Sequence, residues 1–344
     1  MDAIREETIT MFKQLAGMAL IAFLTAWDGA SPTAAEDIKV AVGMAGGVNQ
    51  VPSLVAKAKG FFKEEGLDVD VRALPRGAIA IDAVSNGSLQ FAEAANAAFF
   101  HAVDKGVPLV SIGVSSRGYT GKLLVANRNA GMKSLADLKG KHLATQVGTG
   151  MYTVLLMLLE KQNLKLSDFN VTNLRVVDMP AAMASSDNID AVLGWEPSIQ
   201  RIVQAGKGKV MLTSKQLEDM AGITYPFLVA TSQTYLKEHP DIVQKFMNGY
   251  AKADRYIAAH HEEAVKIYFE EIKRRGAKLS EDDIRLMLFD DVDRFGGAAF
   301  TPADMQDLTS TVSYMEKSKL LKTKLDLGKI LDQSFGKKAD MAAK

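Results

Sequence analysis

Arg76 and Trp195 are the side chains whose chemistry and position most suggest a bound ligand. Trp195 ends a predicted apolar strand, so its indole could cover the apolar body of a ligand or pack in the protein core. Arg76 stands where a helix is predicted to begin, and the helix dipole does not favour a cation there. An anionic ligand group would account for Arg76, as would exposure to solvent or pairing with a surface carboxylate. We predict that both residues bind a ligand.

Small and polar residues occupy the other predicted strand-to-helix turns. In a doubly wound sheet the ligand crevice lies beyond the carboxyl ends of the strands, where helices point unpaired N–H groups into it. Small side chains let a ligand approach the backbone, although a Gly at such a turn needs no ligand. With two tyrosines beside the expected hinge, the predicted ligand-binding residues are Gly47, Asn49, Arg76, Gly77, Ala78, Asn96, Tyr119, Gly148, Thr149, Gly150, Trp195, Glu196 and Tyr225.

Two members of this set have a second interpretation. Glu196 could accept hydrogen bonds from a ligand, but stabilisation of the following helix N-terminus is the interpretation we favour. Asn96 is also the expected N-cap residue of its helix.

No catalytic residue is predicted. Ser115 lies in Gly-Val-Ser-Ser-Arg-Gly, which is one residue too long for the Gly-x-Ser-x-Gly nucleophile elbow. His260 and His261 are adjacent and diverge by about 100° on a helix, unlike the i, i+4 pair of a zinc site. The acidic run at 290–293 begins like a calcium loop, but Pro302 occupies the twelfth position, where a Glu belongs. We therefore expect neither a metal nor a cofactor.

Length and composition limit the class of protein. The chain has 344 residues, whereas single cores stop growing at about 250 to 300, so two lobes are expected. Hydrophobic residues at 47% and charged residues at 24% fit a soluble globular protein and exclude long disordered regions. Lys plus Arg and Asp plus Glu are balanced at 41 each, so no basic field favours nucleic acid. The absence of Cys excludes disulfides and thiolate chemistry.

The first 35 residues differ from the rest. Residues 15–27 form an apolar run, too short for a bilayer span of about 20 residues but suited to a signal peptide. Thr33 and Ala35 fit the minus-three and minus-one positions of a cleavage site, which predicts that residues 1–35 are a signal peptide and that the protein is exported. Acidic residues before the run fit this poorly, and a start at Met11 would remove them. A buried N-terminal helix is the alternative.

Strands alternating with helices predict an α/β fold with parallel strand pairing. Residues 66–99 and 170–199 repeat one order of strand, Pro turn, helix and strand, which favours two similar lobes. We expect the first lobe to contain 36–120, the second 121–221, and the chain to return to the first lobe at 222–344 with C-terminal helices. The segments near 116–121 and 212–225 would then cross between the lobes and act as a hinge. The predicted strands are 38–44, 67–74, 89–94, 107–114, 123–127, 142–147, 171–178, 189–195, 209–213 and 225–231, and the predicted late helices are 241–275, 281–289 and 302–318.

Four stretches resemble the NitT/TauT-type, SsuA/THI5-like periplasmic substrate-binding proteins of ABC importers, which include nitrate, taurine and alkanesulfonate binders. The stretches are VPSLVAKAKGFFKEEGLDVDV (51–71), GMKSLADLKGKHLATQVGTG (131–150), IDAVLGWEPSI (189–199) and YPFLVATSQTYLKEHPDIVQKF (225–246). The resemblance implies a type II two-lobed fold, with two doubly wound sheets joined by two crossing strands that close over a small ligand. It also implies an ABC-transporter permease with its ATPase as partner, and we expect a monomer.

Arg76-Gly77-Ala78 departs from the Gly-Gly-Ala that this family often has, which favours an anionic ligand. We therefore predict an exported solute-binding protein that captures a sulfonate-, nitrate- or carboxylate-like ligand and delivers it to a permease. The alternatives are an enzyme or a sensor on the same fold that handles a pyrimidine-type precursor.

Overall fold

The computed structural model describes residues 37–44, 47–289 and 294–343. The predicted signal peptide and the acidic run at 290–293 lie outside the described residues. Within the described part of the chain, no helix has both the length and the apolar character needed to cross a bilayer.

The first sheet contains five strands in the order β2-β1-β3-β10-β4. Its parallel part consists of β1, β2 and β3. Most apolar residues of these strands are buried, Ile38 at the start of β1 is exposed, and the alternate positions of β2 face solvent. The bounds are β1 (Ile38–Met44), β2 (Leu67–Ala73), β3 (Phe91–Ala95), β4 (Leu109–Ser116) and β10 (Phe227–Ser232).

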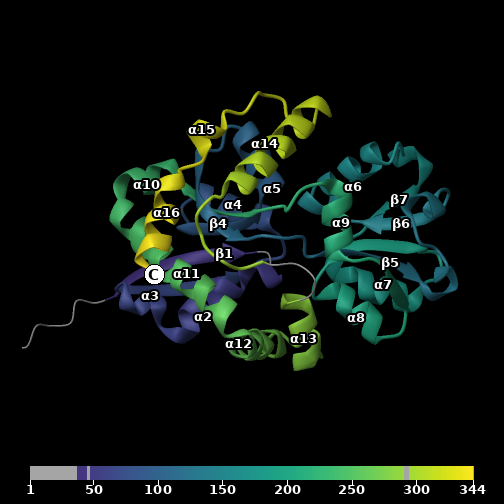
Figure 1. Ribbon diagram of the computed structural model, residues 1–344, viewed down its shortest axis with the longest axis horizontal. Helices are drawn as coiled ribbons and strands as arrows, with labels where there is room; N and C mark the ends of the chain where they lie inside the picture. Colours follow the sequence, from purple (N-terminus) through teal and green to yellow (C-terminus); the bar gives the residue numbers. More distant parts are fainter. Residues whose placement is uncertain (1–36, 45–46, 290–293, 344) are drawn as a thin grey trace, which may run out of the picture. The chain divides into compact units, whose positions relative to one another are not determined.

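The second sheet has the same arrangement, in the order β7-β6-β8-β5-β9. In both sheets the fourth strand of the order is antiparallel to its neighbours, and the third is parallel to the second. The two similar lobes predicted from the repeated order of elements are therefore confirmed, and Figure 1 shows the second set of strands in teal. The bounds are β5 (Gly121–Ala126), β6 (His142–Thr145), β7 (Asn170–Asn173), β8 (Ala191–Trp195) and β9 (Gly208–Leu212).

The prediction of parallel pairing throughout was wrong for β5 and β10. Each is antiparallel to both of its neighbours. The physical reason is that these strands follow no crossover helix of their own sheet: β5 comes directly after β4 through residues 117–120, and β10 enters the first sheet from the second. Only a strand–helix–strand unit within one sheet requires parallel strands.

Helices cover both faces of each sheet, so each lobe has two hydrophobic clusters. One face of the first sheet packs on α2 (Val51–Lys59), α3 (Phe61–Glu64), α10 (Gln233–Glu238), α11 (Pro240–Ala259), α12 (His261–Arg274), α13 (Glu281–Leu288) and α16 (Gln333–Ala342), and the other on α4 (Gly77–Ser85), α5 (Asn96–Asp104), α14 (Pro302–Lys317) and α15 (Leu327–Ile330). The second sheet packs on α6 (Gly150–Lys161) and α9 (Ser214–Ala221) on one face and on α7 (Met179–Ser185) and α8 (Ser198–Gln204) on the other. Short 3-10 turns complete the fold: η1 (Val48–Gln50), η2 (Asn127–Asn129), η3 (Leu135–Leu138), η4 (Leu166–Asp168) and η5 (Val176–Asp178).

The segment 241–275, predicted to be predominantly helical, contains two helices in the structure. His260 has φ −136° and ψ 60°, which are not helical values, so α11 ends at Ala259 and α12 begins at His261. The hydrophobic periodicity continues across this break because both helices pack on the same cluster.

Candidate ligand-binding site

A cavity of about 100 Å³ opens where strand ends and helix starts of the two lobes meet. Most of the predicted ligand-binding residues line it, although they come from segments up to 178 residues apart, from Gly47 to Tyr225. The predicted residues in its wall are Gly47, Asn49, Arg76, Gly77, Ala78, Tyr119, Gly148, Thr149, Gly150, Trp195 and Tyr225. Their contact with a ligand stays a prediction.

Two helix N-termini reach the cavity wall. Gly77 is the first residue of α4, and Gly150 is the first residue of α6, with Thr149 as the N-cap. The Thr149 hydroxyl accepts a hydrogen bond from the Tyr152 N–H (3.3 Å) and donates one to the Gln146 carbonyl (2.7 Å). The first N–H groups of a helix have no intrahelical partner and carry the positive end of its dipole. This part of the cavity is therefore electropositive.

Arg76 adds a formal positive charge beside the start of α4. Its backbone is extended, with φ −163° and ψ 154°, and its side chain does not cap the helix. The Arg76 side chain is exposed and lines the cavity, and within the described part of the chain its guanidinium has no hydrogen bond or ion pair. An anion in the cavity is the partner that this arrangement can accept.

Aromatic rings also line the cavity. The rings of Tyr119 and Tyr225 meet edge to face with centroids 5.3 Å apart, and Phe227 continues this cluster at 5.6 Å from Tyr225. Trp195, at the end of β8, is half-buried and contributes its indole to the same wall. The cavity therefore combines an apolar surface with a small electropositive region.

Close packing at Gly150 joins α6 to Tyr225. A Cβ atom at Gly150 would overlap the Tyr225 hydroxyl and would lie 3.1 Å from the Cβ of Ala95. Tyr225 has a positive φ of 50°, which an L-residue rarely adopts. The absence of a side chain at Gly150 thus lets the start of α6 approach residues of the first lobe.

Glu93 is a carboxyl group in the cavity wall. Glu93 lies on β3, between Met44 of β1 and Val229 of β10, and is 3% exposed. The Ser53 hydroxyl donates a hydrogen bond to Oε1 of Glu93, whereas Oε2 has no partner among the described residues. Burial raises the pKa of Glu93 to about 8. At neutral pH this side chain is therefore mostly a neutral carboxylic acid.

Glu196 does not line the cavity. It is 2% exposed, lies 3.1 Å from the Lys122 ammonium and accepts a hydrogen bond from the Gln200 N–H (2.8 Å) at the start of α8. This geometry agrees with the interpretation that we favoured, stabilisation of a helix N-terminus.

Asn96 also lies outside the cavity wall, with no exposed surface. The prediction that Asn96 is an N-cap was wrong, because α5 begins at Asn96 and its N-cap is Ala95, which has no side-chain oxygen. Neither amide atom of Asn96 has a hydrogen-bond partner within the described residues.

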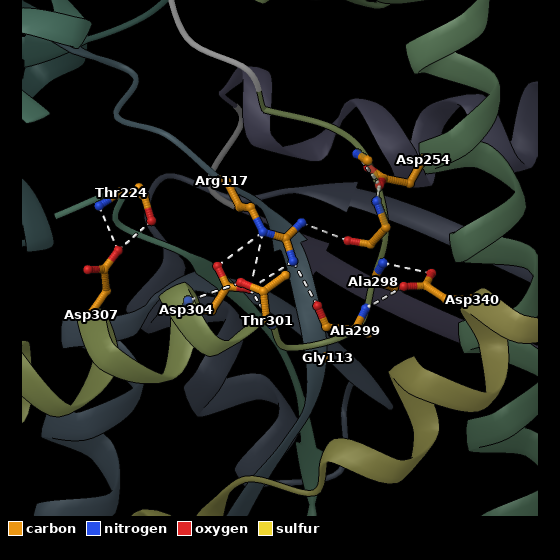
Figure 2. A network of polar contacts seen from close by, with 12 residues as sticks. Gly113, Arg117, Thr224, Asp254, Ala298, Ala299, Thr301, Asp304, Asp307 and Asp340 are labelled. Atoms are coloured by element: carbon orange, nitrogen blue, oxygen red, sulfur yellow. Dashed lines mark hydrogen bonds and ion pairs between the residues drawn. The ribbon is translucent and has the colours of Figure 1, made fainter.

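The two chain segments that cross between the lobes bond to each other and to α14. The Gly118 N–H donates to the Thr224 carbonyl (2.7 Å), and the Thr224 N–H donates to Oδ2 of Asp307 (2.6 Å). Figure 2 shows Arg117 in this network, where its guanidinium contacts Asp304 and the Gly297 and Ala299 carbonyls. The crossing segments are thus anchored to the first lobe, and the hinge motion stays a prediction.

Tyr119 is fixed from both sides within its crossing segment. Its N–H donates to Oε1 of Glu218 on α9 (2.5 Å), and its carbonyl accepts from Nη1 of Arg294 (2.6 Å). These two bonds place the Tyr119 ring in the cavity wall.

The predicted ligand-binding set did not include six residues of the wall: Met44, Glu93, Ala98, Thr120, Met151 and Phe227. All six lie at most two residues from a strand or helix terminus, where neighbouring turns were already selected. For Glu93 a signal was available, because it is the only charged residue in the otherwise apolar strand Phe91–Ala95.

Comparisons with known proteins identify what the chain is similar to. The family model described as NMT1/THI5 like matches residues 48–264. A Bacillus subtilis (strain 168) protein whose name refers to aliphatic sulfonate binding is 24% identical over 341 residues, which cover 96% of this chain and 97% of the relative.

Two solved structures show the same fold. The alkanesulfonate-binding protein SsuA from Xanthomonas axonopodis pv. citri, bound to MOPS, has a TM-score of 0.72 at 19% identity over 87% of this chain and 99% of that chain. The periplasmic nitrate-binding protein NrtA from Synechocystis PCC 6803 has a TM-score of 0.72 at 16% identity over 89% of each chain. The predicted two-lobed α/β fold of periplasmic binding proteins is thereby confirmed.

Proposed function

This chain belongs to the NMT1/THI5-like family, and from that membership we propose that it is the exported solute-binding component of an ABC importer. It captures a small anion of the sulfonate, nitrate or carboxylate kind between its two lobes. The names of the Bacillus subtilis relative and of the two solved structures support this class of ligand.

The cavity wall carries the proposal. Arg76 has no protein partner within the described residues, and the first residues of α4 and α6 lie in the same wall. Because a cation and two helix N-termini stabilise an anion together, we expect the charged end of the ligand beside them. The rings of Trp195, Tyr225 and Phe227 would then cover its apolar part.

The ligand is expected to leave the site unchanged. We propose that contacts from both lobes stabilise a closed state, which requires differential binding but no covalent step. Recovery of the intact ligand after incubation, followed by mass spectrometry, supports this proposal. Conversion of the ligand to a product would favour an enzyme on the same fold.

A thermal-shift screen tests the ligand class. The purified protein, refolded to remove any ligand carried through purification, is screened against short alkanesulfonates, nitrate, carboxylates and aminopyrimidines. A ligand at 100 times its Kd adds about 2.7 kcal/mol of stability, which raises Tm by several degrees. We expect at least one anion to do so. A response to aminopyrimidines alone would contradict the proposed ligand class.

Export and partner are further parts of the proposal. The full chain should appear in the periplasm, with Glu36 as the N-terminal residue of the processed protein. The processed protein should behave as a monomer and stimulate ATP hydrolysis by its permease and ATPase only when its ligand is present. Retention of the whole chain in the cytoplasm, established by fractionation, would contradict the importer role.

A further inference from the structure

The carboxyl group of Glu93 has one hydrogen-bonding position that the protein leaves unused. Its Oε1 accepts the Ser53 hydroxyl, whereas Oε2, on the same buried group, has no partner within the described residues. Glu93 belongs to the wall of the ligand cavity and is 3% exposed. A buried polar atom without a partner costs free energy, so an atom of the ligand is the natural partner for Oε2.

The surroundings of Glu93 supply no positive charge. On the α11 side, the Tyr250 hydroxyl lies beside the Glu93 carboxyl group, where it lowers the Glu93 pKa against the larger effect of burial. The Tyr250 hydroxyl donates its hydrogen to the Ser115 carbonyl (3.0 Å), and beyond it Asp254 accepts the N–H groups of Gly296 and Gly297. The face of α2 toward the sheet contributes Ser53, whereas its Lys59 pairs with Glu263 (2.7 Å) away from the site.

The sheet around Glu93 is also uncharged. Its register partners Met44 and Val229 are apolar, and Ser115 comes from β4. Around the rest of the cavity the titratable groups are Arg76, Tyr119 and Tyr225, and burial raises the pKa of both tyrosines. With no cation against it, an ionised Glu93 would be a buried and unpaired charge.

We propose that Glu93 enters the ligand site as a protonated carboxylic acid and donates its Oε2–H hydrogen bond to an oxygen of the bound anion. The Ser53 bond leaves Oε2 as the oxygen that carries the proton. This inference rests on the proposed function, because an anion in the same small cavity would repel an ionised Glu93 and so requires the neutral form. Glu93 is thereby a specificity residue: it favours ligands with an acceptor oxygen.

The direction in which ligand affinity changes with pH distinguishes a protonated Glu93 that donates a hydrogen bond from an ionised Glu93 that accepts one. A neutral donor loses its proton as the pH rises through the raised pKa of about 8, so affinity for an anion should fall. A ligand with a protonated amine would instead bind an ionised Glu93, and its affinity should rise over the same range.

Ethanesulfonate and nitrate are suitable probes because both keep their charge between pH 7 and pH 9. Calorimetric titrations of the processed protein should show that its affinity for whichever probe it binds falls by about tenfold from pH 7 to pH 9. Glu93→Gln retains a donor at the same position and should bind within about twofold of wild type at pH 7 with no fall at pH 9. Asp254→Asn is the control, because Asp254 is also a buried acid with a raised pKa but lies outside the cavity wall, and it should retain the fall.

An infrared spectrum tests the protonation state without any ligand. The difference between wild type and Glu93→Gln at pH 7 should contain the carbonyl band of a protonated carboxylic acid, which should vanish at high pH. Absence of the band at pH 7, or equal affinity for the probe at pH 7 and pH 9, overturns the inference alone. If wild type binds neither these probes nor any anion of the thermal-shift screen, the proposed function fails together with the inference.

Discussion

Arg117 and Asp304 form a two-point ion pair that fixes a crossing segment to the first lobe. Nε of Arg117 lies 3.0 Å from Oδ1, and Nη2 lies 2.8 Å from Oδ2, of an Asp304 side chain that is 1% exposed (Figure 2). The same guanidinium donates to the Gly297 and Ala299 carbonyls. Arg117 thus attaches the segment between β4 and β5 to α14 and to the chain at 297–299.

Arg117→Leu should destabilise the protein. The substitution leaves the buried Asp304 carboxylate without its cation, and breaking a buried pair typically costs about 3 kcal/mol or more. Urea denaturation measures the loss. Arg72→Leu is the matched control, because the Arg72–Asp70 pair is about half exposed and should contribute less than about 1 kcal/mol. Equal effects of the two substitutions would contradict the assignment.

Gly150→Ala should destabilise the protein by about 1 to 3 kcal/mol through overpacking. The added Cβ would overlap the Tyr225 hydroxyl. Adding Tyr225→Phe removes that hydroxyl and should restore part of the lost free energy of unfolding. Gly131→Ala is the control, since a Cβ there meets no atom within 4 Å. If Tyr225→Phe gives no rescue, the clash lies elsewhere.

Stability should decrease as the pH rises from about 5 to 9. Burial raises the pKa of Asp254 to about 6, of Glu218 to about 7 and of Glu93 to about 8, so the folded state holds these protons more tightly than the unfolded state. For an acid with a raised pKa, the free energy of unfolding falls between its unfolded and folded pKa values as the pH increases.

Glu93 alone should account for about 1.4 kcal/mol of that loss between pH 7 and pH 9. Denaturation of Glu93→Gln across this range isolates the contribution, because the amide does not titrate. A pH profile identical to that of wild type would show that Glu93 does not hold its proton in the folded state.

Trp195 should report ligand binding by its fluorescence. The sequence has two tryptophans, and the other, Trp27, lies in the predicted signal peptide, so the processed protein should contain Trp195 alone. Because its indole lines the cavity, a ligand should change its emission. Mass spectrometry confirms the processing, and a calorimetrically bound ligand that leaves the emission unchanged would place the site elsewhere.

Most strands and helices could be predicted from sequence because local hydrophobic periodicity and capping residues indicate them. Strands such as Ile38–Met44 and helices such as Pro302–Lys317 have clear periodicity and, for the latter, a Thr301 capping box. The antiparallel direction of β5 and β10 was missed because it depends on where the chain changes lobes. Helix α16, which packs on α11 and β4, was also missed.

The residues of the cavity wall could be predicted from sequence where they directly follow a strand. They could not be predicted where their position depends on packing between distant parts of the chain. Turns after strands point to Gly77, Gly148 and Trp195 by a general rule of α/β sheets. No local pattern shows that the side chain of Glu196 pairs with Lys122, or that one carboxyl oxygen of Glu93 has no hydrogen-bond partner within the described residues. Both depend on contacts between residues distant in sequence: Ser53 and Glu93 are 40 positions apart, and Lys122 and Glu196 are 74 positions apart.

The most direct test of the proposed anion site is a calorimetric titration of wild type, Arg76→Ala and Arg72→Ala with the anion that gives the largest thermal shift. Charge-assisted hydrogen bonds contribute about 1.5 to 3 kcal/mol, so Arg76→Ala should weaken binding roughly 10- to 150-fold. Arg72→Ala, outside the cavity, should leave affinity unchanged. Equal affinity of wild type and Arg76→Ala would contradict an anion site at the start of α4.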